Sequence, residues 1–386
     1  MRSTYADVSS HTYRAKSACT LLGISENTLR VYSENSGIQV SRAKETASGI
    51  PSPRIFTPDV IFSLAAYRRD QGYVKVPPHS GVPLVITTSV MKGGTAKTTS
   101  SVELATHLQL LGMRCLVIDL DVQANASQMM GYEADLTADE AEEYGVNQEA
   151  IVKETLATVL IPYLERKPGA DRIPSLEDVI KKPFGEHGPH LLPSDIYVSD
   201  IEKNLLFYTG KLNRNLIFKK FLADSCAGKI PGFNLSGYDV IIFDCPPSVS
   251  CTSTCALAAA DIVLAPIRMD AFSLKGLTKL FAELQDLQES VFVAPELIIL
   301  PTNYSANINR VGRMQGKLNP YKEFISPISI STSEEFPKSL EGYMPLTIQK
   351  PLQAGSKEYR EFAVYMQEKI MTLAEKRAKK HEGAAV

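Results

Sequence analysis

The chain lacks several features that would place it in a class at once. Its formal net charge is only −2 over 386 residues, which excludes a polycation. No uninterrupted apolar run is long enough to span a membrane, and no signal peptide is recognisable, so we expect a cytoplasmic protein. The six cysteines are scattered along the chain, which makes a reduced compartment the default.

Patterns that would bind a structural metal are also weak. Cys251-x-x-x-Cys255 lies near Cys245, but this spacing is not the C-x-x-C of zinc ribbons. A helix of small residues over 250–260 explains these cysteines as buried side chains, and we favour that interpretation over a metal site. His187 and His190 lie in a Gly/Pro loop without a second ligand pair, so we expect them to be solvated.

A phosphate-binding pattern is present at residues 82–99. An apolar, β-branched run leads into M-K-G-G-T-A-K-T-T, and a helix-like pattern follows. Glycines let backbone N–H groups face one point, and the new helix directs its positive N-terminal end there. Lys97 supplies a cation for the β- and γ-phosphates, and the Thr98 hydroxyl suits Mg²⁺. The predicted nucleotide-binding residues are Lys92, Gly93, Gly94, Thr95, Ala96, Lys97, Thr98 and Thr99. An ordinary glycine-rich turn is the alternative.

Acidic residues end two further apolar runs. Asp119 and Asp121 follow the run that starts at Cys115, and Asp244 ends the run that starts at Tyr238. Such runs are typical of parallel strands buried on both faces, and open α/β sheets bind ligands at the carboxyl ends of their strands. We therefore expect Asp244 to reach Mg²⁺ directly or through water. Two acids that only cap a helix would show the same spacing as Asp119 and Asp121.

The rest of this region continues the α/β pattern. Strands are expected at 261–267 and 297–303, with an amphipathic helix at 273–288 between them. Residues 133–149 carry seven acids and no base, so a solvated helix or loop is expected there. Further helices are predicted at 155–164, 176–180, 201–221 and 357–380. The fold class is thus α/β, a doubly wound, mostly parallel sheet over residues 81–386.

The first 80 residues predict a separate DNA-binding domain with a linker at 75–81. They carry ten Lys/Arg against six Asp/Glu, a net charge of +4. A helix, a turn at Gly23–Ser25 and a second helix from Glu26 form a helix-turn-helix pattern. A Ser/Gly/Pro-rich stretch at 41–54 predicts a wing, and Thr57-Pro58 begins a third helix. The candidate DNA contacts are Ser25, Asn27, Thr28, Arg30, Arg42 and Lys44. A helical dimerisation module is the alternative.

The ordered motifs resemble those of the ParA/MinD ATPases. K-G-G-x-x-K-T resembles their deviant Walker A loop, in which the early lysine, Lys92 here, is the signature residue. I-D-L-D-V-Q-A-N resembles Walker A′ with Val122 in place of proline, and D-C-P-P resembles Walker B. Ala96 stands where the general P-loop NTPase pattern has glycine. The N-terminal segment resembles winged helix-turn-helix regulators, so the whole chain is similar to the larger, plasmid-type ParA partition proteins.

The resemblance carries functional expectations. It implies ATP, ADP and Mg²⁺ as cofactors and an ATP-driven homodimer in which Lys92 reaches the phosphates of the other subunit. Asp121 would orient the attacking water, Asp119 would hold a Mg²⁺-bound water, and Thr302 and Asn303 would lie on the adenine side. Implied partners are a ParB-type centromere-binding protein, operator DNA and non-specific DNA of the nucleoid. The basic residues expected on the non-specific DNA surface share one helical face: Arg310, Arg313 and Lys317.

Other interpretations stay open at this point. The basic face at 310–317 can equally be an ordinary solvated face. A membrane-associated positioning ATPase of the MinD kind would use the C-terminal helix, although we expect that helix to pack on the sheet and no membrane to be bound. A nucleotide-gated repressor with little turnover would use residues 1–80 in the same way. A metal-cluster carrier of the P-loop class would need bridging cysteine pairs.

Overall fold

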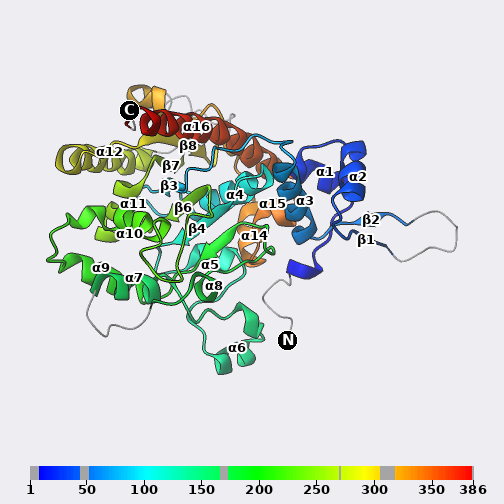
Figure 1. The fold of residues 1–386 in the computed structure, drawn as a ribbon, viewed down its shortest axis with the longest axis horizontal. Coiled ribbons are helices and arrows are strands. Elements are labelled where there is room, and N and C mark those ends of the chain that lie inside the picture. Colours follow the sequence, from blue (N-terminus) through cyan, green and yellow to red (C-terminus); the bar gives the residue numbers. More distant parts are fainter. Residues whose placement is uncertain (1–7, 44–51, 166–172, 269–270, 305–317, 385–386) are drawn as a thin grey trace.

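A computed structural model describes residues 8–43, 52–165, 173–268, 271–304 and 318–384. Its centre is a six-stranded sheet in the order β5-β4-β6-β3-β7-β8, in which all neighbouring strands are parallel (Figure 1). The strands are β3 (Leu84–Thr88), β4 (Cys115–Asp119), β5 (His190–Leu192), β6 (Val240–Asp244), β7 (Ile262–Arg268) and β8 (Glu296–Thr302). The predicted doubly wound α/β architecture is confirmed.

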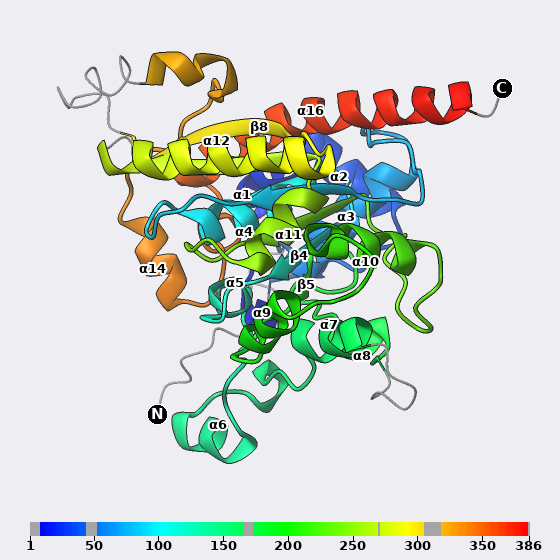
Figure 2. The ribbon, with the colours of Figure 1, turned by 90° about the vertical axis from the view of Figure 1, so that its left-hand side faces the viewer.

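Helices cover both faces of the sheet, because alternate strand residues point in opposite directions. Ile86 of β3 joins a cluster with α4 (Lys97–Leu110) and α16 (Ala354–Ala384) on one face. Val85 joins the cluster on the other face. The helices of that second face are α7 (Leu156–Glu165), α9 (Val198–Leu206), α10 (Ile217–Cys226) and α11 (Cys251–Ala259), continued over β7 and β8 by α12 (Ala271–Val291). Figure 2 shows α12 and α16 running along one side of the molecule.

The N-terminal segment contains the three expected helices, whereas most of the predicted wing at 41–54 lies outside the described residues. Its elements are η1 (Val8–Ser10), α1 (Ala15–Leu22), α2 (Glu26–Asn35), β1 (Ser41–Arg42), β2 (Arg54–Ile55) and α3 (Pro58–Asp70), with β1 and β2 antiparallel. We call its described residues, 8–43 and 52–70, the N-terminal module. Its apolar side chains belong to the same cluster as α4 and α16, and Tyr13 Oη donates to the Ile348 carbonyl at 2.7 Å. The module therefore shares one core with the α/β body.

The segment between β4 and β6 holds the main departure from the sequence predictions. Its other elements are α5 (Asn125–Met129), α6 (Ala138–Tyr144), η2 (Gln148–Ala150), α8 (Leu176–Val179) and η3 (Arg214–Leu216). The single helix predicted over 201–221 is wrong, because α9 ends at Leu206 and α10 begins at Ile217. The Asn213 side chain accepts the Asn215 N–H at 3.0 Å and starts a new turn there, which a count of apolar spacing misses.

The C-terminal part packs back onto the body. It contains η4 (Asn319–Phe324), α14 (Glu335–Glu341), α15 (Leu346–Gln349) and α16. The apolar stripe of α16 is buried, and Phe362, Met366 and Ile370 have no exposed surface. The stripe contacts α4, so it forms core as predicted. Among the described residues, no helix combines the length and apolar character needed to cross a membrane.

Candidate nucleotide site

The turn between β3 and α4 has the shape of a phosphate-binding loop. Gly94 and Ala96 both have φ of +68°, the left-handed region in which a Cβ is strained. Ala96 is the N-cap of α4, so the backbone reverses just before the helix begins. The free N–H groups at the start of α4 and its positive dipole end then point toward the same place. The loop can cradle an anion without further rearrangement of the fold.

Lys97 is the buried cation of this loop. Its side chain is buried, and Nζ donates to the Lys92 carbonyl at 2.8 Å. Burial lowers the pKa of Lys97, and the nearby Asp244 carboxylate partly offsets that shift. Lys92 itself is half-buried, and its carbonyl also lies near the Thr95 hydroxyl. The two lysines predicted to bind phosphate are therefore joined through the loop backbone.

Asp244 is held by two hydroxyl groups of α4. Thr98 Oγ1 donates to one carboxylate oxygen and Ser101 Oγ to the other, each at 2.8 Å. Asp244 ends β6, where its register partners are Thr88 of β3 and Asp119 of β4. The predicted magnesium residues Thr98, Asp119 and Asp244 thus lie at one edge of three adjacent strands. Ser101 was not predicted, although it stands one helical turn after Lys97.

Asp119 and Asp121 begin the turn into α5. The Asp119 carboxylate accepts from Ser127 N at 2.9 Å, Ser127 Oγ at 2.8 Å and Asp121 N at 3.1 Å. Asp121 is buried, and its Oδ1 accepts from Gln123 N at 3.0 Å. Ser194, just after β5, donates its hydroxyl to the Asp121 carbonyl at 2.7 Å. Asp119 therefore shapes the turn that positions Asp121.

The donor set fits a hard divalent cation. Burial raises the pKa of both Asp119 and Asp244, and the negative charge of Asp244 adds to the shift at Asp119. A divalent cation relieves such repulsion, and carboxylate and hydroxyl oxygens are the ligands that Mg²⁺ prefers. Thr88 Oγ1, beside Asp244, is a buried oxygen without a hydrogen-bond partner. No group of three or more His, Cys, Asp or Glu that could hold a metal occurs among the described residues, so phosphate oxygens and water would have to complete the shell.

The predicted adenine-side residues lie at the end of β8. Thr302 is buried, and its hydroxyl donates to the Thr95 carbonyl at 3.1 Å. Thr302, at the end of β8, thereby supports the phosphate loop. Asn303 follows with φ of +49°, a left-handed conformation that ends the strand. Contact of either residue with adenine stays a prediction.

The predicted DNA contacts of the N-terminal module cluster near the start of α2. Ser25 caps the helix by accepting from Thr28 N at 3.1 Å, and Arg30 donates to the Asn27 side chain at 3.2 Å. Arg42, on β1, donates to the Ser52 carbonyl at 3.0 Å. Ser25, Asn27 and Arg30 are exposed. Their binding to DNA stays a prediction. Lys44, Arg310, Arg313 and Lys317 lie outside the described residues.

The three cysteines and His190 of the weak metal patterns are packed or hydrogen-bonded within the protein. Cys245 and Cys255 are buried, and Cys251 is half-buried on α11. His190 Nδ1 lies 2.8 Å from Tyr238 Oη, and its Nε2 lies 3.0 Å from the Glu186 carbonyl. His190 is thus bonded within the protein, and the prediction that it is solvated in a loop is wrong, because His190 begins β5 and pairs with Leu116 of β4.

Comparisons with known proteins agree with this geometry. A family profile described as AAA domain (AAA_31) matches residues 84–299. The cell division protein PomZ of Myxococcus xanthus is 28% identical over 271 residues, 69% of this chain and 72% of PomZ. The sporulation initiation inhibitor protein Soj of Bacillus subtilis is 29% identical over 205 residues, 53% of this chain and 66% of Soj.

Solved structures share the fold. The ATP complex of McdA from Cyanothece has a TM-score of 0.56 and 18% identity, covering 73% of this chain and 96% of McdA. A structure described as a partition protein has a TM-score of 0.58 and 18% identity, covering 94% of this chain and 93% of that one. At these identities the likeness concerns the fold alone. The second match extends over more of the chain than the AAA domain.

Proposed function

The chain belongs to the AAA_31 family of AAA domains, and from that premise we propose that it is a Mg²⁺- and ATP-dependent ATPase of the ParA type that segregates DNA. The observation that carries the proposal is the loop in which buried Lys97 bonds to the Lys92 carbonyl at 2.8 Å while Thr98 holds Asp244 at 2.8 Å. This places a cation, a hydroxyl and a carboxylate at the start of one helix. Phosphate and magnesium need these groups together.

In this proposal the residues of the site have separate roles. The backbone N–H groups of 93–98 and Lys97 bind the β- and γ-phosphates, and Thr98 and Asp244 hold Mg²⁺, which neutralises charge on the phosphates when bound. Asp119 would hold Mg²⁺ through a water molecule, and its carboxylate accepts the Asp121 N–H at 3.1 Å. Asp121 orients the attacking water with its buried carboxylate, which lies in the same turn and accepts from Gln123 N. ADP and phosphate are the products.

The proposal extends to assembly and DNA. Lys92 reaches the phosphates of a second subunit, so that ATP drives a homodimer. That dimer binds nucleoid DNA non-specifically, with Arg310, Arg313 and Lys317 as contacts. A ParB-type centromere-binding protein stimulates hydrolysis. The N-terminal module binds operator DNA through the start of α2 and represses its own operon, as in plasmid partition systems. The exposed polar side chains at Ser25, Asn27 and Arg30 support that assignment.

A turnover assay with Mg²⁺-ATP, DNA and the product of the adjacent gene tests this function. We expect DNA-stimulated hydrolysis in the unaltered protein. Lys92→Gln should abolish turnover and ATP-dependent DNA binding while ADP binding persists. Lys376→Gln, an exposed lysine near the end of α16, is the matched control and should behave normally. Absence of turnover under all conditions would favour a repressor that uses ATP only as a ligand, and normal turnover of Lys92→Gln would refute the role of that lysine across the dimer.

A further inference from the structure

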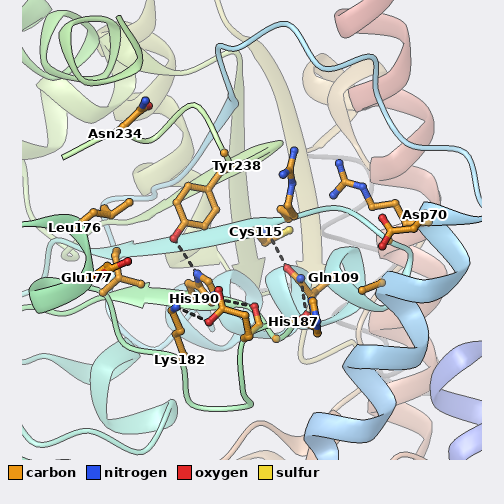
Figure 3. A pocket seen from close by; sticks show the side chains of 18 residues that line it. Asp70, Gln109, Cys115, Leu176, Glu177, Lys182, His187, His190, Asn234 and Tyr238 are labelled. Carbon is orange, nitrogen blue, oxygen red and sulfur yellow. Dashed lines mark hydrogen bonds and ion pairs between the residues drawn. The ribbon is translucent and has the colours of Figure 1, made fainter. Parts of the chain in front are cut away.

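A second cavity lies at the edge of the sheet opposite to the phosphate loop. It has a volume of about 600 Å³ and is lined at the starts of β4, β5 and β6 by Cys115, His190 and Tyr238. Figure 3 shows α3 of the N-terminal module forming one wall, with Asp70, while Leu176 and Glu177 of α8 lie on the opposite side. A volume of this order suits a small organic ligand. A molecule bound here would touch both the N-terminal module and the α/β body.

Two arginines of the lining give the cavity an unbalanced positive charge. Arg69 of α3 donates to both Asp239 oxygens, at 2.9 and 3.3 Å, and the Arg114 guanidinium lies 3.6 Å from the same carboxylate. The Arg114 N–H also donates to Asp239 at 2.7 Å. Two guanidinium groups therefore share one buried carboxylate. The Arg114 side chain is 45% exposed and keeps donors for an anion, since a guanidinium offers five.

Two carboxylates of the lining, Asp70 and Glu177, give the cavity unpaired negative charge as well. Asp70 and Glu177 are exposed, and the described residues provide neither with a hydrogen bond or an ion pair. The remaining charges of the lining cancel, because Lys182 pairs with Glu186 at 2.5 Å. The polar groups of the inner wall are also used internally: Gln109 bonds to the His187 carbonyl and to Cys115 N. The lining thus offers one net positive charge, at Arg69 and Arg114, and two negative charges, at Asp70 on α3 and Glu177 on α8.

We propose that this cavity binds a free amino acid with a basic side chain. Such a ligand carries two cationic groups and one carboxylate, the charge complement of Asp70, Glu177 and Arg114. The carboxylate bonds to Arg114, and the α-ammonium and the side-chain cation pair with the two acids of the lining. Leu176 and Ile180 of the lining contact the aliphatic stem. A bound ligand thereby links α3, through Asp70, to α8, through Glu177.

Isothermal titration of the full chain, saturated with Mg²⁺-ADP to occupy the phosphate loop, tests the site. L-arginine should bind with one-to-one stoichiometry. L-argininamide, which lacks the carboxylate, and citrulline, which lacks the side-chain cation, should each bind at least tenfold more weakly. The tripeptide Gly-Gly-Arg, whose arginine has an amide in place of the α-ammonium, should also bind at least tenfold more weakly, and tighter binding of the tripeptide than of arginine contradicts the proposal. No saturable binding of any probe overturns the proposal, as does equal binding of all of them.

Variants of lining residues test whether the ligand binds in the cavity. Arg114→Ala and Glu177→Gln should each raise the Kd for arginine at least tenfold, whereas Glu142→Gln, an exposed acid on α6, should leave it unchanged. Gly237 lines the cavity and a Cβ there meets no atom within 4 Å, so Gly237→Trp adds a large side chain at the lining and should block binding. Unchanged affinity in both Arg114→Ala and Gly237→Trp, with normal Mg²⁺-ADP affinity as proof of folding, contradicts this location.

Discussion

Two alanines hold the turns of the nucleotide site in a conformation that favours glycine. Ala96 has φ of +68° and precedes α4, and Ala124 has φ of +50° and precedes α5. A left-handed residue with a Cβ costs roughly 1–2 kcal/mol, so both turns store local strain. Strain of this kind is common where a backbone is shaped for a ligand. The general phosphate-loop pattern avoids it with glycine at the position of Ala96.

Ala96→Gly should relieve this strain. We expect it to stabilise the protein by about 0.5–1 kcal/mol. Glycine adopts the left-handed conformation freely, and the strain relieved in the folded protein exceeds the free-energy cost of the greater conformational freedom that glycine gives the unfolded chain. Urea unfolding of the nucleotide-free protein measures the change. Ala138→Gly, on exposed α6, is the matched control and should destabilise, since glycine weakens a helix. A loss of stability in Ala96→Gly would show that the turn needs the alanine side chain.

Asp121 is the residue that we assign to the attacking water. Asp121→Ala should lower turnover roughly 100-fold or more, the usual contribution of a group that handles a proton or water, and should accumulate an ATP-bound dimer. A turnover assay and light scattering with ATP measure the two effects. Asp121→Asn keeps an acceptor for Gln123 N, so it separates loss of charge from loss of the turn. A monomeric variant that hydrolyses ATP at the normal rate is incompatible with this role.

At the scale of elements, α4 and α15 meet through a buried polar contact. Glu103 of α4 has no exposed surface and accepts from Thr347 Oγ1 and, at 3.3 Å, from Thr347 N. Thr347 Oγ1 also lies 2.8 Å from His107 Nε2. Burial raises the pKa of Glu103 to about 7, while burial lowers that of His107 to about 3. The folded protein therefore favours a protonated Glu103 beside a neutral imidazole.

This contact predicts a pH dependence of stability. The folded pKa of Glu103 exceeds its unfolded value, so its contribution is complete below pH 4.5 and is lost as the pH rises toward about 7. Glu103→Gln removes that loss. The free energy of unfolding of Glu103→Gln minus that of the unaltered protein should rise by roughly 3 kcal/mol at most between pH 4.5 and 8. Chemical denaturation across this range measures it, and a difference that does not change with pH would mean that Glu103 stays ionised.

The elements show what a sequence can and cannot predict here. The strands other than β5 (His190–Leu192) were predictable, because parallel strands covered on both faces must be apolar throughout, and acids at their ends then lie close together. The supporting groups were not. Ser194 bonds to the Asp121 carbonyl, and Glu202 of α9 accepts from Cys251 N and Thr252 N at the start of α11. Such contacts join residues far apart in sequence, and serine and glutamate are common at surfaces, so no local pattern marks them.

At the scale of the whole molecule, the N-terminal module shares a hydrophobic core with the α/β body, while the charge and turn chemistry of residues 1–80 predict a separate domain. Phe56 and Phe62 are buried in the cluster that also contains α4 and α16. Arg68 of α3 donates to the Leu22 carbonyl at 2.7 Å, and Arg69 pairs with Asp239 at the start of β6. Local sequence patterns predict the helices of this segment but not the surface on which they pack. The described contacts predict that the module and the body unfold together.

Arg69→Ala tests this coupling, because it removes the ion pair that joins α3 to the sheet. The Asp239 side chain is 1% exposed, and among the described residues it then keeps only Arg114, at 3.6 Å, as a charged partner, so we expect a loss of about 1–3 kcal/mol in the free energy of unfolding. Calorimetry should show a single transition that moves as a whole to lower temperature by a few degrees. Arg14→Ala, an exposed arginine of the same module, should leave it in place. Two transitions, of which only the smaller one moves, would instead identify the module as an independent domain. In that case, an effect of nucleotide binding at the phosphate loop could be transmitted to α2 only through a linker.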